Sequence, residues 1–156
     1  MEPLKPWMRY LLRFVGVYNL LAALTMLVFY HESFKFLGVA KPQLMLPVQL
    51  VGILVGLFGV GYLLVASNPV ENRNLLTLGF LSKALGSALG VGYVVLGKLP
   101  PMFLLILFFA DIMYLPPFWI IMRRLYAIAR SDAQKDSAMS HRPCDATTPM
   151  TKLPAA

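Results

Sequence analysis

Residues 75–96 read LLTLGFLSKALGSALGVGYVVL and residues 101–122 read PMFLLILFFADIMYLPPFWIIM, and these two runs decide the fold. Both are apolar, and each carries a single charge, Lys83 in the first and Asp111 in the second. A helix of about 20 apolar residues crosses a bilayer core of about 30 Å. Only GKLP separates the two runs, so we expect two antiparallel membrane spans that lie side by side.

Two more apolar runs precede this pair. The chain of 156 residues is 58% hydrophobic and 13% charged, whereas soluble domains contain about 25% charged residues. No run alternates polar and apolar residues as a β-barrel wall does. The predicted fold class is all-α, a transmembrane four-helix bundle with spans at about 10–30, 46–66, 75–96 and 101–122. The first run is too long for a signal-peptide core, so we expect it to be retained as a span.

The composition changes after residue 130. Residues 131–156 are polar, are rich in Ser, Thr, Ala and Pro, and show no apolar periodicity. We therefore expect a disordered cytoplasmic tail after a membrane domain of residues 1–130. The single cysteine, Cys144, lies in this tail, and one cysteine cannot form an internal disulfide.

Basic residues are divided unevenly between the two ends of the predicted spans. Multi-pass membrane proteins carry their excess of Lys and Arg on the cytoplasmic side. One side holds Lys5, Arg9, Arg13, Arg73, Arg123, Arg124, Arg130, Lys135, Arg142 and Lys152, and the other holds Lys35, Lys41 and Lys98. Both termini should therefore be cytoplasmic. The formal net charge of +7 is then a signal of topology, and nucleic acid is not an expected partner.

Lys83 and Asp111 are the charges buried deepest in the predicted spans. A charge near the bilayer centre costs at least about 2.5 kcal/mol, so such charges are usually paired. At 1.5 Å per residue, the two lie about 13 and 16 Å from the cytoplasmic ends of their spans. The sequence therefore predicts a Lys83–Asp111 ion pair inside the bundle. In the alternative, Lys83 extends unpaired to the cytoplasmic interface.

Other polar side chains reach a similar depth. Tyr18 and Asn19 do so on the first span, and Tyr114 follows Asp111 by three positions, on the same helix face. The candidate intramembrane polar site is therefore Lys83, Asp111, Asn19, Tyr18 and Tyr114. Such a cluster either fixes the register of the helices or forms a ligand or proton site.

Glycines recur at helical spacing in the second and third spans. Small residues at this spacing allow helix backbones to approach closely. The predicted helix-packing glycines are Gly52, Gly56, Gly59, Gly79, Gly86 and Gly90. Because Gly79, Gly86 and Gly90 share a stripe with Lys83, the alternative is a slot beside Lys83 for a flat or chain-like ligand.

Pro116 and Pro117 predict a kink in the fourth span, because they remove the helical partners of the carbonyls of Ile112 and Met113. Sequence motifs of soluble enzymes are absent: the chain contains no GxxxxGK[ST], GxSxG, HExxH or Rossmann glycine run. His31, His141 and Cys144 lack the spacing of a metal site. We therefore assign no catalytic residue and expect no metal or cofactor.

Over about residues 7–125 the chain resembles the DoxX-like family of small four-helix integral membrane proteins, and most closely a bacterial subgroup of uncharacterised function. The motifs are Tyr18-Asn19, the glycines of the second span with Gly61-Tyr62 and Asn68-Pro69, Gly79 with Lys83 and Gly86, and Asp111 with Tyr114 and Pro117-Phe118. The resemblance implies a bacterial inner membrane location. It links the chain to quinone-coupled oxidation of sulfur compounds, redox maturation and receptor assembly. A peroxide-reductase activity is not supported, because it needs a reactive cysteine in a structured site.

Three functions follow from these observations. The first is an accessory or scaffold protein that binds a membrane-protein partner, or another copy of itself, through its glycine faces. The second is a binding or redox module for a quinone or other lipid-soluble small molecule at Lys83 and Asp111. The third is a minimal transporter or proton conductor. All three place the chain in a lipid bilayer.

Overall fold

The computed structural model describes residues 4–38, 40 and 42–140, and its secondary structure within these residues is helical. The helices are α1 (Pro6–Leu27), α2 (Tyr30–Leu37), α3 (Leu46–Ser67), α4 (Arg73–Val95), α5 (Met102–Ala110), the short 3-10 helix η1 (Ile112–Tyr114) and α6 (Leu115–Ser140). Within the described residues, four helical stretches are long and apolar enough to cross a membrane, the fourth being Met102–Lys135. The all-α prediction is confirmed, and the fold is that of a multi-pass integral membrane protein.

Turn residues set the ends of several helices. Pro6 stands in the first turn of α1 and Pro47 in that of α3, where a missing N–H breaks no helical hydrogen bond. Gly97 has a φ of 67° and makes the tight turn between α4 and α5. This left-handed backbone is accessible to glycine without strain. The turn reverses the chain and places α5 beside α4, as expected from the short connection.

The helix ends differ from the predicted bounds at two places. The first long helix ends at Leu27 instead of at about residue 30, and Tyr30–Leu37 forms the separate helix α2. The tail expected to be disordered from residue 131 continues α6 as far as Ser140. Residues 131–140 contain helix formers and no proline, so adding them to an existing helix costs little free energy. The rest of the predicted tail, with Cys144, lies outside the described residues.

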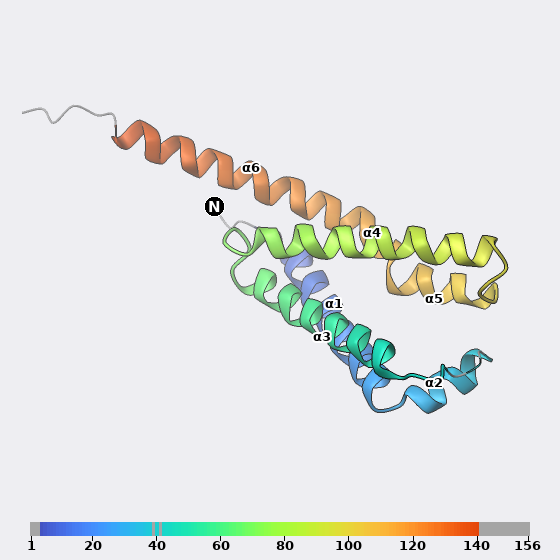
Figure 1. Cartoon of the computed structure of the whole chain (residues 1–156). Helices are drawn as coiled ribbons and strands as arrows, with labels where there is room; N and C mark the ends of the chain where they lie inside the picture. The colour runs from blue at the N-terminus through green and yellow to red at the C-terminus, as the bar shows by residue number, and fades with distance from the viewer. Residues whose placement is uncertain (1–3, 39, 41, 141–156) are drawn as a thin grey trace, which may run out of the picture.

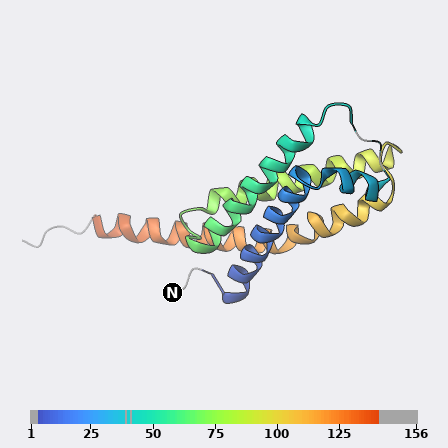
Figure 2. The same ribbon diagram turned by 90° about the horizontal axis from the view of Figure 1, so that it is seen from below.

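The spans form two helix pairs. Figure 1 shows α1 packed along α3, and α4 lying beside α5 with α6 continuing past the first turns of α4. The two pairs approach each other where α3 connects to α4, which we call the closed end. They diverge toward α2 and the α4–α5 turn, which we call the open end; Figure 2 shows the same helices from below.

The closed end contains the hydrophobic core, to which α1, α3, α4 and α6 all contribute. Its buried members are Leu4, Met8, Leu12, Val15, Tyr62, Val65, Ala66, Leu76, Tyr114, Phe118, Ile121 and Leu125. Many apolar side chains point outward instead, such as Leu85 at 70% exposed and Leu105 at 61%. Side chains of this kind face lipid in a membrane protein. The core therefore fixes one end of the bundle and leaves the other end less closely packed.

Candidate functional site

The site centres on the ion pair between Lys83 and Asp111. Lys83 projects from the middle of α4, and Asp111 stands at the junction of α5 and η1. The Lys83 Nζ lies 2.6 Å from Asp111 Oδ1, so the ion pair predicted from depth is confirmed. The Lys83 side chain is 8% exposed and that of Asp111 27%. Lys83 therefore does not extend to the interface as an unpaired charge.

A break in the fourth span supplies a second partner for Lys83. Asp111 departs from helical geometry with φ −131° and ψ −56°, and the Tyr114 N–H donates to the Asp111 carbonyl at 3.1 Å. In a continuous helix that N–H would donate to the carbonyl of Ala110. The Ala110 carbonyl instead accepts a hydrogen bond from Lys83 Nζ at 2.9 Å. Lys83 thus binds both the carboxylate and the backbone group that the break releases.

The predicted kink is present, but it lies before the prolines and not at them. Pro116 and Pro117 fall in the first turn of α6. The N–H groups of a first turn have no acceptor within the helix, so their absence in proline breaks no helical hydrogen bond. The Ile112 carbonyl accepts from the Leu115 N–H, so it is not left without a partner as predicted. The prolines therefore start α6, and the irregular backbone lies at Asp111.

Tyrosine and asparagine side chains surround the ion pair. The Tyr114 ring centroid is 5.6 Å from Lys83 Nζ, within the range of a cation–π contact. The Tyr18 ring lies 6.3 Å from that of Tyr114, and Asn19 is buried at 4% exposed. The structure thus brings all five predicted polar residues to one place, between α1, α4 and the α5–η1 junction.

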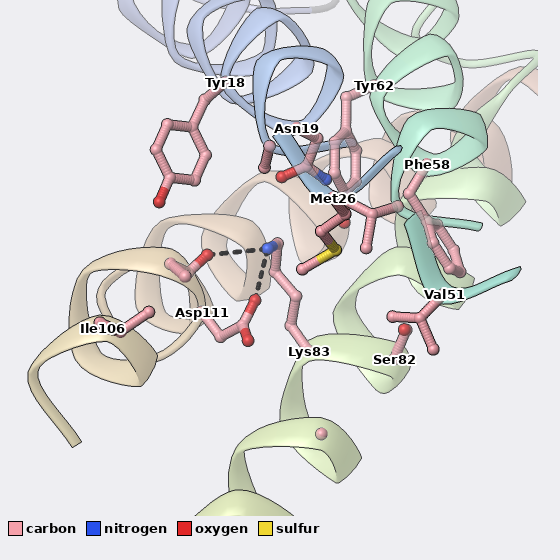
Figure 3. Close-up of a pocket in the computed structure, with 14 residues that line it drawn as sticks. Tyr18, Asn19, Met26, Val51, Phe58, Tyr62, Ser82, Lys83, Ile106 and Asp111 are labelled. Atoms are coloured by element: carbon pink, nitrogen blue, oxygen red, sulfur yellow. Dashed lines mark hydrogen bonds and ion pairs between the residues drawn. The ribbon is translucent and has the colours of Figure 1, made fainter. Parts of the chain in front are cut away.

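A cavity of about 330 Å³ lies beside these residues, between the two helix pairs. Figure 3 shows Lys83 reaching into it from α4 and Asn19 from α1. Its polar end holds Lys83, Asp111, Asn19 and Tyr18. Toward the open end its walls are apolar, and they include Met26, Val51, Val55 and Ile106. The cavity therefore has a polar end and an apolar arm.

Most of the predicted glycines pack against a neighbouring helix, and one does not. A Cβ at Gly59 would meet the Gly16 carbonyl at 2.8 Å, and one at Gly79 would meet the Tyr62 ring at 2.5 Å. The corresponding contacts of Gly52, Gly56 and Gly90 are with Met26, Ala23 and Leu107. A Cβ at Gly86 would have no neighbour within 4 Å. The packing role predicted for Gly86 is wrong: the helices diverge at this level, and Gly86 lines the cavity.

Sequence reasoning assigned Tyr62, Phe58 and Gly16 no place in the site or in its packing. Tyr62 and Phe58 line the cavity from α3, and Gly16 packs against Gly59. The two aromatic residues lie in an apolar run, where aromatic side chains usually form core. Gly16 stands alone in its helix without a glycine repeat. The hydroxyl of Tyr62 was the one signal of a polar surrounding.

No protein-family model, curated protein or solved structure matches the chain. The DoxX-like resemblance therefore stays an expectation from the sequence motifs.

Proposed function

We propose that this membrane protein binds a lipid-soluble small molecule through an acceptor oxygen placed at Lys83, with a quinone as the favoured class. The observation that carries the proposal is the cavity of about 330 Å³ whose polar end contains the Lys83–Asp111 pair. Ligand pockets are usually apolar, with a few polar groups that fix the ligand's orientation. This cavity has that composition.

Lys83 is suited to hold an oxygen of a ligand. An ammonium group has three N–H donors, and within the described residues two of them serve the Ala110 carbonyl and Asp111. The third is left for an acceptor. The two bonds and the Tyr114 ring hold the ammonium in position, so little side-chain entropy remains to be lost on binding. A carbonyl oxygen at the polar end would complete the coordination of this group.

The rest of the cavity suits a flat apolar head with a chain. Phe58 and Tyr62 provide aromatic walls, and Gly86 leaves room beside Lys83 where other residues would place a side chain. The apolar arm runs toward the open end, where the two helix pairs diverge. A hydrocarbon tail placed there would lie among apolar side chains.

The test fills the cavity without touching the ion pair. In Gly86→Leu the new side chain enters the cavity, whereas in the matched control Gly92→Leu it sits on the same helix outside the lining. Each variant is purified and titrated with a short-chain benzoquinone, and the melting temperature is followed. We expect the quinone to raise the melting temperatures of the wild type and of Gly92→Leu. The melting temperature of Gly86→Leu should not change when the quinone is added.

A matching test uses the protein purified from native membrane, with mass spectrometry of the small molecules and proteins that accompany it. A quinone present with the wild type and lost in Gly86→Leu supports the proposal. A stoichiometric protein partner with no small molecule would favour the scaffold function instead. That function has less support in the fold, because Gly52, Gly56 and Gly59 are already in contact with α1 and do not offer a free face.

We also propose that both ends of the chain face the cytoplasm of a bacterial inner membrane. The proposal is supported by Arg73, which begins α4 at the closed end, and by Lys98, which lies in the α4–α5 turn at the open end, since the two belong to the two predicted groups of basic residues. A membrane-impermeant thiol reagent applied to intact cells should leave Cys144 unlabelled. Labelling of Cys144 would overturn this orientation.

A further inference from the structure

A second pocket lies between α4 and α6, apart from the cavity at Lys83. It has a volume of about 470 Å³, and its lining includes Arg123, Tyr126, Ala127 and Arg130 of α6 together with Thr77 of α4. Positions 123, 126–127 and 130 recur at helical spacing, so these side chains share one face of α6. The small Ala127 leaves room between the two arginines.

The wall of this pocket is fixed by hydrogen bonds. The Tyr126 hydroxyl donates to Asn74 Oδ1 at 3.1 Å and lies 3.2 Å from Thr77 Oγ1, which joins α6 to α4. The Arg73 guanidinium carbon lies 5.8 Å from the Tyr126 ring centroid. A third positive charge therefore adjoins the two arginines of the pocket.

The arginines of the pocket are not neutralised inside the chain. Among the residues that the structure describes, neither Arg123 nor Arg130 forms an ion pair with a carboxylate, and both are exposed. Arg123 directly follows the apolar run that ends at Met122, so the pocket lies where α6 leaves the apolar region. Basic side chains at this level of a membrane protein lie near the phosphate groups of lipids.

We propose that this pocket binds the phosphate of an anionic phospholipid headgroup, with Arg123 and Arg130 as the ligating side chains. Guanidinium groups bind phosphate oxygens through paired N–H donors, and basic pockets between spans on the cytoplasmic side suit anionic headgroups. The acyl chains would lie along the exposed apolar side chains of the spans. This site is independent of the proposed ligand at Lys83.

The experiment measures the lipid that the full-length protein retains. The protein in detergent is mixed with phosphatidylglycerol and, separately, with phosphatidylcholine, and bound lipid is counted by native mass spectrometry. Phosphatidylglycerol should bind the wild type more tightly than phosphatidylcholine. The double variant Arg123→Gln/Arg130→Gln should bind phosphatidylglycerol roughly 30-fold more weakly, because each basic residue near an anionic lipid contributes about fivefold.

Two single variants separate a shaped site from general attraction between charges. Lys135→Gln removes a positive charge from the same helix outside the pocket lining, and it should bind phosphatidylglycerol as the wild type does. Ala127→Leu changes no charge but fills the space between the arginines, and it should weaken binding severalfold. Equal binding by the wild type and the double variant would overturn the proposal. So would a loss of about fivefold in Lys135→Gln, which is the loss expected for one arginine of the pocket.

Added inorganic phosphate distinguishes the two sources of this chemistry. Phosphatidylglycerol that stays bound in an excess of inorganic phosphate supports a lipid headgroup as the occupant. If inorganic phosphate displaces the lipid from the wild type at equal concentration, the pocket is a site for soluble phosphate compounds and the lipid assignment is overturned.

Discussion

The α1–α3 pair and the α4–α5 pair are both antiparallel, yet they are held together by different forces. In the first, Gly59 lies against the Gly16 carbonyl and Gly56 against Ala23, so the two backbones are close along their length. In the second, Lys83 binds a broken backbone and a carboxylate, and Gly86 faces an open cavity. Backbones in close contact leave no room for a ligand between them, whereas the polar contact at the helix break leaves both space and one unused N–H donor of Lys83.

Gly59→Val should have the largest effect on stability, and it acts on the α1–α3 pair. Its Cβ would meet a backbone carbonyl at 2.8 Å, and a backbone atom cannot rotate away as a side chain can. We expect a loss of about 3 kcal/mol in the free energy of unfolding. The measurement is unfolding in mixed micelles, followed by helix content as the denaturing detergent is increased.

Gly61→Val is the control for that change. Gly61 lies two positions away in the same helix, and a Cβ there would have no neighbour within 4 Å. Its effect should be within about 1 kcal/mol. Similar losses in both variants would mean that valine weakens α3 itself and that the contact with Gly16 does not hold the pair together.

Lys83→Met should have the next largest effect, and it acts on the second pair. It leaves Asp111 and the Ala110 carbonyl without their shared donor. Removing one partner of a fully buried pair costs about 3–5 kcal/mol, and we expect about 2 kcal/mol here because Asp111 is 27% exposed. The same micelle titration gives the value.

The double variant Lys83→Met/Asp111→Leu sharpens the comparison. If the loss in Lys83→Met comes from an unpaired carboxylate, removing that carboxylate should recover part of it. The double variant should nevertheless give no quinone-dependent rise in melting temperature. A quinone response equal to that of the wild type would show that the pair only stabilises the fold.

Gly86→Ala should have the smallest effect on stability, with the opposite sign. Its Cβ enters open space, and replacing glycine inside a helix lowers the entropy of the unfolded chain. We expect a gain of about 0.5 kcal/mol in the same titration. A loss comparable to that of Gly59→Val would mean that Gly86 packs against a neighbour and that the cavity is closed.

Much of the fold was predictable because it depends on quantities that are local in sequence. Four runs of spanning length predicted four spans, and the tight turn at Gly97 predicted neighbouring helices. The depths of Lys83 and Asp111 follow from counting residues, so their ion pair was predictable as well. The helical continuation of α6 through residues 131–140 was missed, because polar composition alone cannot distinguish an exposed helix from a disordered segment.

The contacts of individual residues were less predictable. Gly59 and Gly86 are both glycines in similar apolar runs, yet one packs against a backbone and the other faces a cavity. The difference comes from where the neighbouring helix lies, and no short stretch of sequence records that position. Tyr62 was missed as a cavity residue for the same reason.

The sequence by itself determined the number of spans, the tight turn between α4 and α5, and the Lys83–Asp111 ion pair. It did so because hydropathy, length and charge can be read along one helix at a time. The tertiary structure decided where the fourth span breaks, which carbonyl accepts a hydrogen bond from Lys83 and which glycine faces the cavity. These depend on how far apart the two helix pairs lie at each level. The two helix pairs are in contact at the closed end, where the hydrophobic core lies, and they are separated beside Lys83. That separation creates the candidate site.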